Sequence, residues 1–384
     1  MKNVKGVIKY LLFILLMLLL WAPMLNERLK VLGPYPLKGN IIEVSDVDFS
    51  LLTWWGGIFS EGKEKYIEQH FGLRDYLIRI YNQLAFILWK FTNADSMIIG
   101  KNNYIYAIDY IEAVEGKDYI GHNRIADQTT KLRLIQDTLE KLNITLLVVL
   151  APGKGNYFPE YIPDIYYKKN PTTNFADYKI ELAKKKVHNI DFNTWFIKNK
   201  FISKYPLYPQ CGVHWSMYGS WLVADSIVKK IEAIRNIDLP DAKMSFLSYP
   251  ESARFDDYDA GDVLNLLFMP DNFKMAYPYT VMEKDSVKHK LDAIIIADSY
   301  YWQIKSSQIP AGVFNNETFW FYNRVLPGPV GKPRGLKGLA LKNEIDKNKV
   351  IIILSNTVHL KELGWGFIDD AYALYFGTNK ISQF

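Results

Sequence analysis

The sequence predicts an α/β domain built on a mainly parallel sheet, and three observations support this class. From about residue 120 onward, helical patterns alternate with short apolar runs, as they do in sheets covered by helices. The runs at residues 144–150, 292–297 and 350–354 are almost continuously apolar, which is typical of interior parallel strands. A chain of 384 residues that is 49% hydrophobic also has enough apolar material for a sizeable core.

The amino terminus predicts a membrane anchor at residues 1–25. Lys2, Lys5 and Lys9 precede an apolar segment that can cross a hydrocarbon core of ~30 Å if Lys9 extends toward the surface. Because positive residues stay on the cytoplasmic side, the rest of the chain is expected outside the cytoplasm. A cleaved signal peptide is the alternative, but no paired small residues mark a cleavage site before Asn26.

Residues 26–94 are expected to form a linker followed by a helical lead-in. Glycine and proline punctuate residues 26–58, and helical patterns follow at 61–71 and 74–91. The second pattern carries an apolar stripe, which indicates either a core face or a surface near the membrane. Two apolar runs around a Gly-Lys-Asn-Asn turn then predict a hairpin at 97–107. The main domain is expected to comprise residues 95–384.

The elements of this domain follow from periodicity and from turn residues. Helices are expected at 123–142, at 174–185, directly after Ser216 and, as a short apolar helix, at 263–268. Strands are expected at 144–150, 188–192, 244–248 (an edge strand), 292–297, 318–322 and 350–354. This order predicts a sheet assembled from segments that lie far apart in the chain.

A proline-punctuated loop leads into the helix after Ser216 and carries His214 just before it. Ser216 is a good N-cap residue, so the histidine is expected at a helix N-terminus. The positive end of the helix dipole disfavours imidazolium, which favours the neutral ring that a general base needs. The alternative is that His214 and Trp215 form a packed, hydrogen-bonded pair with no chemical role.

The strand at 292–297 ends in Asp298-Ser299, which places a serine at a carboxyl strand end. Open α/β sheets hold ligands and reactive side chains at this edge. A serine on a strand-to-helix turn can present its hydroxyl while neighbouring backbone N–H groups face an oxyanion. The sequence therefore predicts Ser299 as a nucleophile with His214 as its base.

The tract ending His214-Trp215 and the later strand ending Ala297-Asp298-Ser299-Tyr300 resemble the alginate O-acetyltransferase family, AlgJ and AlgX. The resemblance covers roughly residues 95–375, and it includes Gly100-Lys-Asn-Asn-Tyr-Ile-Tyr106, Pro152-Gly-Lys154 and Leu363-Gly-Trp-Gly-Phe-Ile368. It implies a circularly permuted SGNH-hydrolase-like fold on the periplasmic side of the inner membrane. It also implies acetyl transfer to an exopolysaccharide, a membrane-bound O-acyltransferase partner, Ser299 as nucleophile and His214 as base.

The sequence departs from this family at two positions. The family pattern has an aspartate two residues before the histidine, where this chain has Gly212, and a glycine where it has Ala297. In serine proteases, replacing the triad aspartate lowers turnover about 10⁴-fold because the imidazole is held wrongly. Either a backbone carbonyl or a carboxylate from residues 254–262 orients His214, or the site is weak or inactive.

Several residues beside strand ends are candidates for binding the oxyanion or the substrate. Asn323 and Asn356 can supply amide donors beside the Ser299 N–H, although asparagines are also common turn residues. Tyr300 is a further candidate, and Lys154 can touch a polar ligand or lie in a solvated turn. Aromatic residues in predicted loops can stack on sugar rings or complete the core: Tyr157, Phe158, Tyr161, Tyr300, Tyr301, Trp302 and Tyr322.

These features predict an O-acetyltransferase that modifies an exopolysaccharide or cell-envelope glycan through a serine acetyl-enzyme. An acetyl esterase of the same fold and a catalytically degenerate polysaccharide-binding scaffold are the alternatives. The net charge of +5 comes from lysines that are scattered along the sequence, so no cluster of positive charge indicates a surface that binds nucleic acid. The single cysteine, Cys211, excludes an intrachain disulfide and zinc-finger spacing, and no cofactor or metal is expected.

Overall fold

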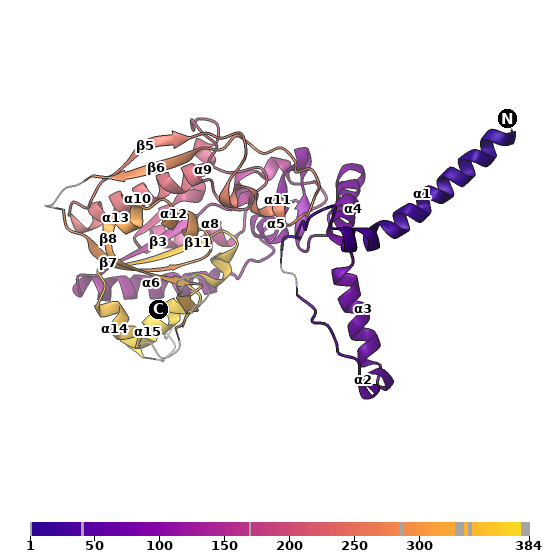
Figure 1. The fold of residues 1–384 in the computed structure, drawn as a ribbon. Helices are drawn as coiled ribbons and strands as arrows, with labels where there is room; N and C mark the ends of the chain where they lie inside the picture. The colour runs from indigo at the N-terminus through magenta and orange to yellow at the C-terminus, as the bar shows by residue number, and fades with distance from the viewer. Residues whose placement is uncertain are drawn as a thin grey trace. The chain divides into compact units, whose positions relative to one another are not determined.

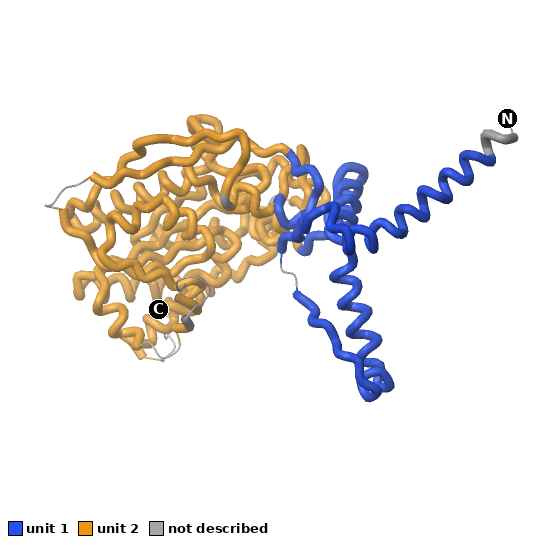
Figure 2. Tube along the Cα trace, viewed as in Figure 1, with its two compact units in different colours: residues 1–95, 261–270 blue, residues 96–260, 271–384 orange. Residues whose placement is uncertain are grey.

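The computed structural model describes residues 2–39, 42–168, 170–283, 288–326, 334–336 and 340–377 (Figure 1). The chain divides into two compact units, shown in Figure 2. Unit 1 comprises residues 1–95 and 261–270, and unit 2 comprises residues 96–260 and 271–384.

Unit 2 is organised around a seven-stranded sheet of order β10-β9-β8-β7-β11-β3-β4. Its five main strands are parallel: β8 (Phe314–Phe321), β7 (Leu291–Ala297), β11 (Val350–Asn356), β3 (Thr145–Ala151) and β4 (Asn189–Asp191). The short strands β9 (Val325–Leu326) and β10 (Arg334–Gly335) pair antiparallel at one edge. The predicted α/β class with a mainly parallel sheet is therefore confirmed.

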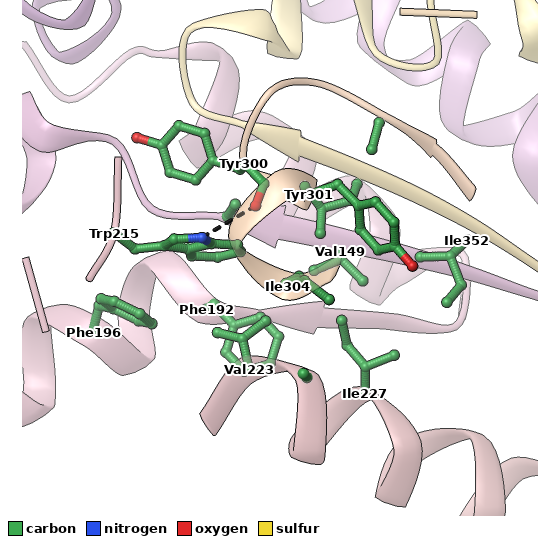
Figure 3. Close-up of a cluster of buried hydrophobic side chains, with 14 of the residues drawn as sticks. Val149, Phe192, Phe196, Trp215, Val223, Ile227, Tyr300, Tyr301, Ile304 and Ile352 are labelled. Atoms are coloured by element: carbon green, nitrogen blue, oxygen red, sulfur yellow. Dashed lines mark hydrogen bonds between the residues drawn. The ribbon is translucent and has the colours of Figure 1, made fainter. Parts of the chain in front are cut away.

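Helices cover both faces of this sheet, because alternate residues of each buried strand point to opposite sides. Leu147, Val149 and Ile295 face one cluster, whereas Leu146, Val148 and Ile294 face the other. The first face carries residues of α9 (Phe192–Asn199), α10 (Met217–Arg235), α12 (Tyr301–Ser306) and α13 (Ile309–Val313). The second carries residues of α6 (His122–Lys141), α8 (Asn174–Lys184), α14 (Leu341–Asp346) and α15 (Phe367–Phe376). Figure 3 shows part of the first cluster, where Val149 and Ile352 of the sheet face Val223 and Ile227 of α10.

The remaining elements of unit 2 are small. The expected hairpin is present as β1 (Met97–Ile99) and β2 (Ile105–Ala107), followed by α5 (Ile108–Glu115) and later α7 (Lys154–Tyr157). The edge strand expected at 244–248 is β5 (Ala242–Ser248), which pairs antiparallel with β6 (Tyr277–Met282) in a separate sheet. Between them lies α11 (Asp259–Asp262).

Unit 1 contains α1 (Lys2–Leu29), α2 (Leu51–Trp55), α3 (Ile58–His70) and α4 (Arg74–Trp89). Within α1, residues Gly6–Leu29 have a mean hydropathy of 2.2 and are long and apolar enough to cross a membrane. The short helix expected at 263–268 is wrong, because this segment is irregular. The carbonyls of Leu264 and Leu266 instead accept hydrogen bonds from side chains of α4.

Candidate functional site

The structure brings together three side chains from distant parts of unit 2. His214, just before α10, places Nε2 2.7 Å from Oγ of Ser299, which follows β7. Nδ1 of the same ring lies 2.6 Å from Oδ2 of Asp259, the first residue of α11. A carboxylate accepts, so Nδ1 carries the proton and Nε2 is left to accept from the serine hydroxyl. This arrangement is that of a serine–histidine–aspartate triad.

An N-cap and a hydrogen bond fix the residues that follow His214 beside the turn that carries Ser299. Ser216 caps α10 as predicted, because its hydroxyl accepts from the Gly219 N–H at 2.9 Å. The Trp215 indole N–H donates to the Tyr300 carbonyl at 3.2 Å, and this bond is drawn in Figure 3. The two residues after the histidine are thus fixed, and Trp215 is bonded directly to the residue after Ser299.

Lys154 is fully buried and does not lie in the solvated turn that the sequence suggested. Its Nζ donates to the carbonyls of Gln210 and Gly212, both at 2.7 Å. Burial lowers the pKa of this amine to about 7. The two hydrogen bonds lie in the loop that leads to His214, so Lys154 positions that loop.

Gly212 stands where a carboxylate was expected, and the structure leaves no room for a side chain there. A Cβ at this position would lie 2.5 Å from the Asp256 carbonyl oxygen and 2.8 Å from Cγ of Pro209. The carboxylate comes instead from Asp259, within the acidic tract at 254–262. Its second oxygen, Oδ1, accepts from the Val213 N–H at 2.8 Å, so Asp259 binds both the ring and the backbone beside it.

We predict that Gly212→Ala destabilises the fold by about 1–3 kcal/mol, because the loop must shift away from backbone atoms that cannot yield easily. Urea unfolding of the purified chain measures this loss. Gly33→Ala is the matched control, because a Cβ at Gly33 would meet no atom within 4 Å. Equal stability of the two variants would contradict the close packing of this loop.

The electrostatic balance at His214 differs from the one predicted from the helix dipole. Burial lowers the pKa of His214, but the hydrogen bond and charge of Asp259, together with the charges of Asp256 and Asp298, raise it by more. The net pKa lies above the ordinary value for histidine. The neighbouring carboxylates therefore favour the protonated imidazolium, which is the opposite of the neutral ring predicted from the helix N-terminus.

Asp298 organises the turn that carries the serine, a role that the sequence reasoning missed. This buried carboxylate accepts from the Tyr300 N–H at 3.0 Å and from the Asn356 N–H at 2.8 Å. Its Oδ2 also lies 3.1 Å from Nδ1 of His359. Asp298 thereby joins the carboxyl ends of β7 and β11, and the only sequence signal for it is its place directly before Ser299.

The residues proposed to bind the oxyanion differ in whether their hydrogen-bond donors are already bonded to other groups. Asn323 lies in a left-handed turn, and its amide donates to the Trp365 carbonyl at 3.1 Å. Tyr300 is buried, and its N–H and hydroxyl are already bonded to Asp298 and to the Val213 carbonyl. Asn356 Oδ1 accepts from the Val358 N–H at 2.8 Å, while its Nδ2 is buried without a hydrogen-bond partner in the described structure.

Among the loop aromatics, Tyr322 lies beside the serine. Its hydroxyl interacts with both the side chain and the backbone of Ser299, and burial raises the pKa of this phenol. Its ring packs against His359 and Trp365, each with centroids 5.2 Å apart. An aromatic cluster next to Ser299 is thus formed by the rings of Tyr322, His359 and Trp365. His359 has no local sequence pattern that would have identified it.

Most of the other aromatic candidates belong to the core. Tyr157, Phe158, Tyr300 and Tyr301 are buried, and Trp302 packs on the same cluster. Phe158 lies between the rings of Tyr104, Tyr157 and Tyr208. The predicted sugar-stacking role of Tyr157 and Phe158 is therefore wrong, since neither ring has a free face. Tyr161 is partly exposed and stacks on Tyr104 at 3.8 Å.

We predict that Phe158→Ala destabilises unit 2 by about 3–5 kcal/mol, as expected for the loss of a buried aromatic ring. The thermal unfolding midpoint should fall clearly below that of Phe201→Ala, which removes a ring that is 90% exposed. An unchanged thermal unfolding midpoint combined with weaker oligosaccharide binding would instead show that Phe158 belongs to a surface that binds sugar.

The residues that the structure describes contain no group of three or more His, Cys, Asp or Glu side chains arranged to hold a metal ion. The single cysteine, Cys211, is buried.

Comparison with known proteins finds similarity to proteins described as acetyltransferases. Residues 97–279 match a family described as "SGNH hydrolase-like domain, acetyltransferase AlgX". This range includes His214 and Asp259 and ends before Ser299. A probable alginate O-acetylase AlgJ from Pseudomonas syringae is 22% identical over 136 residues, which are 35% of this chain and 33% of that protein. The match thus spans about a third of the curated relative's length.

Two solved structures are also similar. The O-acetyltransferase domain of Pseudomonas putida AlgJ has a TM-score of 0.47 and 13% identity over 73% of this chain and 99% of that chain. Pseudomonas aeruginosa AlgX has a TM-score of 0.43 and 10% identity over 71% of this chain and 67% of that chain.

Proposed function

Because the chain carries an AlgJ/AlgX-like SGNH hydrolase domain, we propose that it is an O-acetyltransferase acting on an exopolysaccharide or another cell-envelope glycan. One observation carries the proposal. His214 bridges Ser299 and Asp259 with contacts of 2.7 Å and 2.6 Å, which is the geometry that activates a serine nucleophile. The AlgX description and the AlgJ relative support acetyl as the transferred group and a polysaccharide as the acceptor.

In the first half-reaction, Ser299 Oγ attacks the carbonyl carbon of a donor acetyl group while its proton passes to His214 Nε2. The carbonyl electron pair moves to oxygen and forms a tetrahedral intermediate. Collapse of the intermediate expels the donor's leaving oxygen, which takes the proton from His214. The product is acetyl-Ser299. Asp259 stabilises the imidazolium that exists between these two proton transfers.

In the second half-reaction, a sugar hydroxyl gives its proton to His214 Nε2 and attacks the acetyl-serine. The second tetrahedral intermediate releases Ser299 Oγ, which recovers the proton from His214. The acetyl group is then on the sugar, and the enzyme returns to its starting state. Each step transfers one proton through the same nitrogen, as general acid–base catalysis at a single site requires.

For the oxyanion, we assign Asn356 as the side-chain donor. Among the amide candidates, Asn356 Nδ2 is the one that is buried and makes no hydrogen bond in the described structure, whereas the Asn323 amide is already bonded. Asn356 is also linked to the serine turn through Asp298. An unused buried donor is costly unless a ligand or a water satisfies it, which favours a role in binding.

An acetyl esterase would use the same acetyl-serine with water as the acceptor. A degenerate scaffold is the other alternative, and it rested on the missing aspartate at Gly212. Since Asp259 supplies a carboxylate to His214, that reason for inactivity no longer applies. We further propose that α1 anchors the chain in the inner membrane, with unit 2 in the periplasm. There, a membrane-bound O-acyltransferase partner would supply the acetyl group.

We predict that the purified full-length chain transfers acetyl from p-nitrophenyl acetate to exopolysaccharide oligosaccharides, and that mass spectrometry detects acetylated sugar. The Ser299→Ala variant should give neither acetylated sugar nor accelerated release of nitrophenol. Release of acetate alone, with every oligosaccharide left unmodified, would favour the esterase. No ester cleavage by the unmodified chain would favour the scaffold.

A further inference from the structure

Helix α4 buries three polar side chains together with Ala85 and Phe86, and exposes most of its large apolar side chains. Arg79, Asn82 and Gln83 lie in the buried part of the helix, and Arg79 is only 4% exposed. The outward residues recur at helical spacing and form a continuous apolar stripe: Leu77, Ile80, Tyr81, Leu84, Ile87, Leu88 and Phe91. Of the two interpretations of the α4 stripe, a core face and a surface near the membrane, the core face is wrong, because these residues are exposed.

Hydrogen bonds fix the rotation of the helix about its axis. Arg79 donates to the carbonyls of Leu266 and Pro36 at 3.1 Å and 2.9 Å, and Asn82 donates to the Leu264 carbonyl at 3.0 Å. Turning the stripe inward would break these bonds and leave the carbonyls of Leu264, Leu266 and Pro36 without these donors. The outward stripe is thus enforced by the packing of unit 1.

The same unit ties α4 to the end of the apolar helix α1. A Cβ at Gly72, two residues before α4, would contact the Pro23 carbonyl oxygen and lie 3.0 Å from the Glu27 N. The Tyr76 hydroxyl, in the first turn of α4, donates to the Gly33 carbonyl at 3.1 Å. Glu27 is the first charged residue after the apolar run of α1, so it marks the depth at which that helix would leave the hydrocarbon. Helix α4 therefore begins at the level of the membrane surface.

We propose that the outward stripe of α4 binds the surface of the bilayer that α1 spans, with the helix lying in the headgroup region. The only charged residue between Leu77 and Leu88 is Arg79, which is buried on the opposite side. Tyr81 is 59% exposed and Trp89 is 69% exposed, and tyrosine and tryptophan are the residues enriched at membrane–water interfaces. A helix with these properties is typical of an interfacial amphipathic helix. The proposal rests on α1 as the membrane anchor and does not depend on the acetyl-transfer chemistry.

The test uses the full-length chain reconstituted into phosphatidylcholine vesicles, with one cysteine introduced at Leu84 or Leu88 and labelled with a fluorophore. The native Cys211 is buried, so the unsubstituted chain should take up little label. Brominated lipids quench fluorophores that touch the acyl region, and iodide quenches those that face water. Ile180→Cys on α8 is the matched control, since Ile180 is an apolar residue of unit 2 that is 62% exposed.

We expect brominated lipid to quench the α4 labels several-fold more than the Ile180 label, and iodide to show the reverse order. Quenching of the α4 labels by iodide to the extent seen at Ile180 would overturn the proposal, because the stripe would then face water. Protection of the α4 labels from both quenchers would also overturn it, since a protein partner or a second copy of the chain would then cover the stripe.

Discussion

Replacing Ser299 with alanine is expected to lower acetyl release from a model ester on the order of 10⁴- to 10⁶-fold. His214→Ala should lower the rate of acetyl release to a similar residual value, and the double variant should be no slower than either single variant. The reason is that the serine oxygen attacks only while the imidazole takes its proton, so removing either group abolishes the same step. Steady-state kinetics with p-nitrophenyl acetate measure all three rates.

Matched controls separate this effect from general damage to the protein. Ser306→Ala and His289→Ala change exposed residues of the same types and should keep the rate of the unmodified chain. Single variants of Ser299 and His214 that retain this rate would leave the chain as a binding scaffold. Losses that multiply in the double variant would show that the two residues act in separate steps.

The second large effect is expected at Asp259. Asp259→Asn should lower turnover by about 10⁴-fold, the loss seen when the equivalent aspartate is replaced in serine proteases. The amide cannot accept the Nδ1 proton and stabilise the imidazolium as the carboxylate does. Asp271→Asn, which changes an exposed carboxyl of unit 2, is the control and should have little effect.

The pH dependence gives this prediction a second readout. His214 must be neutral to act as a base, so the rate rises as pH increases through its pKa, which Asp259 raises above the ordinary histidine value. In Asp259→Asn the main raising influence is lost while burial still lowers the pKa. The acid limb of the kcat/KM profile should therefore move to lower pH as the maximal rate falls. An unmoved acid limb would mean that the contact at 2.6 Å does not control the titration of His214.

Ser299 and His214 could be proposed as a nucleophile and its base from the sequence, because each lies at the end of a regular element with a clear local pattern. An apolar run predicts the strand before Ser299, and an N-cap followed by helical spacing predicts the helix after His214. Asp259 could be placed only within an acidic tract, since its contact with His214 closes a loop of 45 residues. No local pattern selects one carboxylate among several in such a loop.

The incorrect expectations have a common physical cause, which is that burial depends on tertiary packing. Lys154 follows a strand in a Pro-Gly-Lys turn, and turns of this kind usually face solvent. In the structure its amine instead donates hydrogen bonds to two carbonyls of the loop that leads to His214. The predicted loop position of Phe158 left open whether its ring stacks on a sugar or completes the core, and the ring lies among other aromatic rings. The stripe of α4 has the spacing of a core face and is turned outward because Arg79 and Asn82 bind the loop at 261–270.

Acetyl-Ser299 is an obligatory intermediate in the proposed mechanism, and peptide mapping by mass spectrometry can detect it. The full-length chain is mixed with p-nitrophenyl acetate, stopped with acid within the first turnovers and digested. We predict a mass increase of one acetyl group on the peptide that contains Ser299, located at that serine by fragmentation. We also predict that the modification disappears when an accepting oligosaccharide is added before the acid. Turnover without any acetyl group on Ser299, or with the acetyl group on another residue, would contradict the acetyl-Ser299 intermediate.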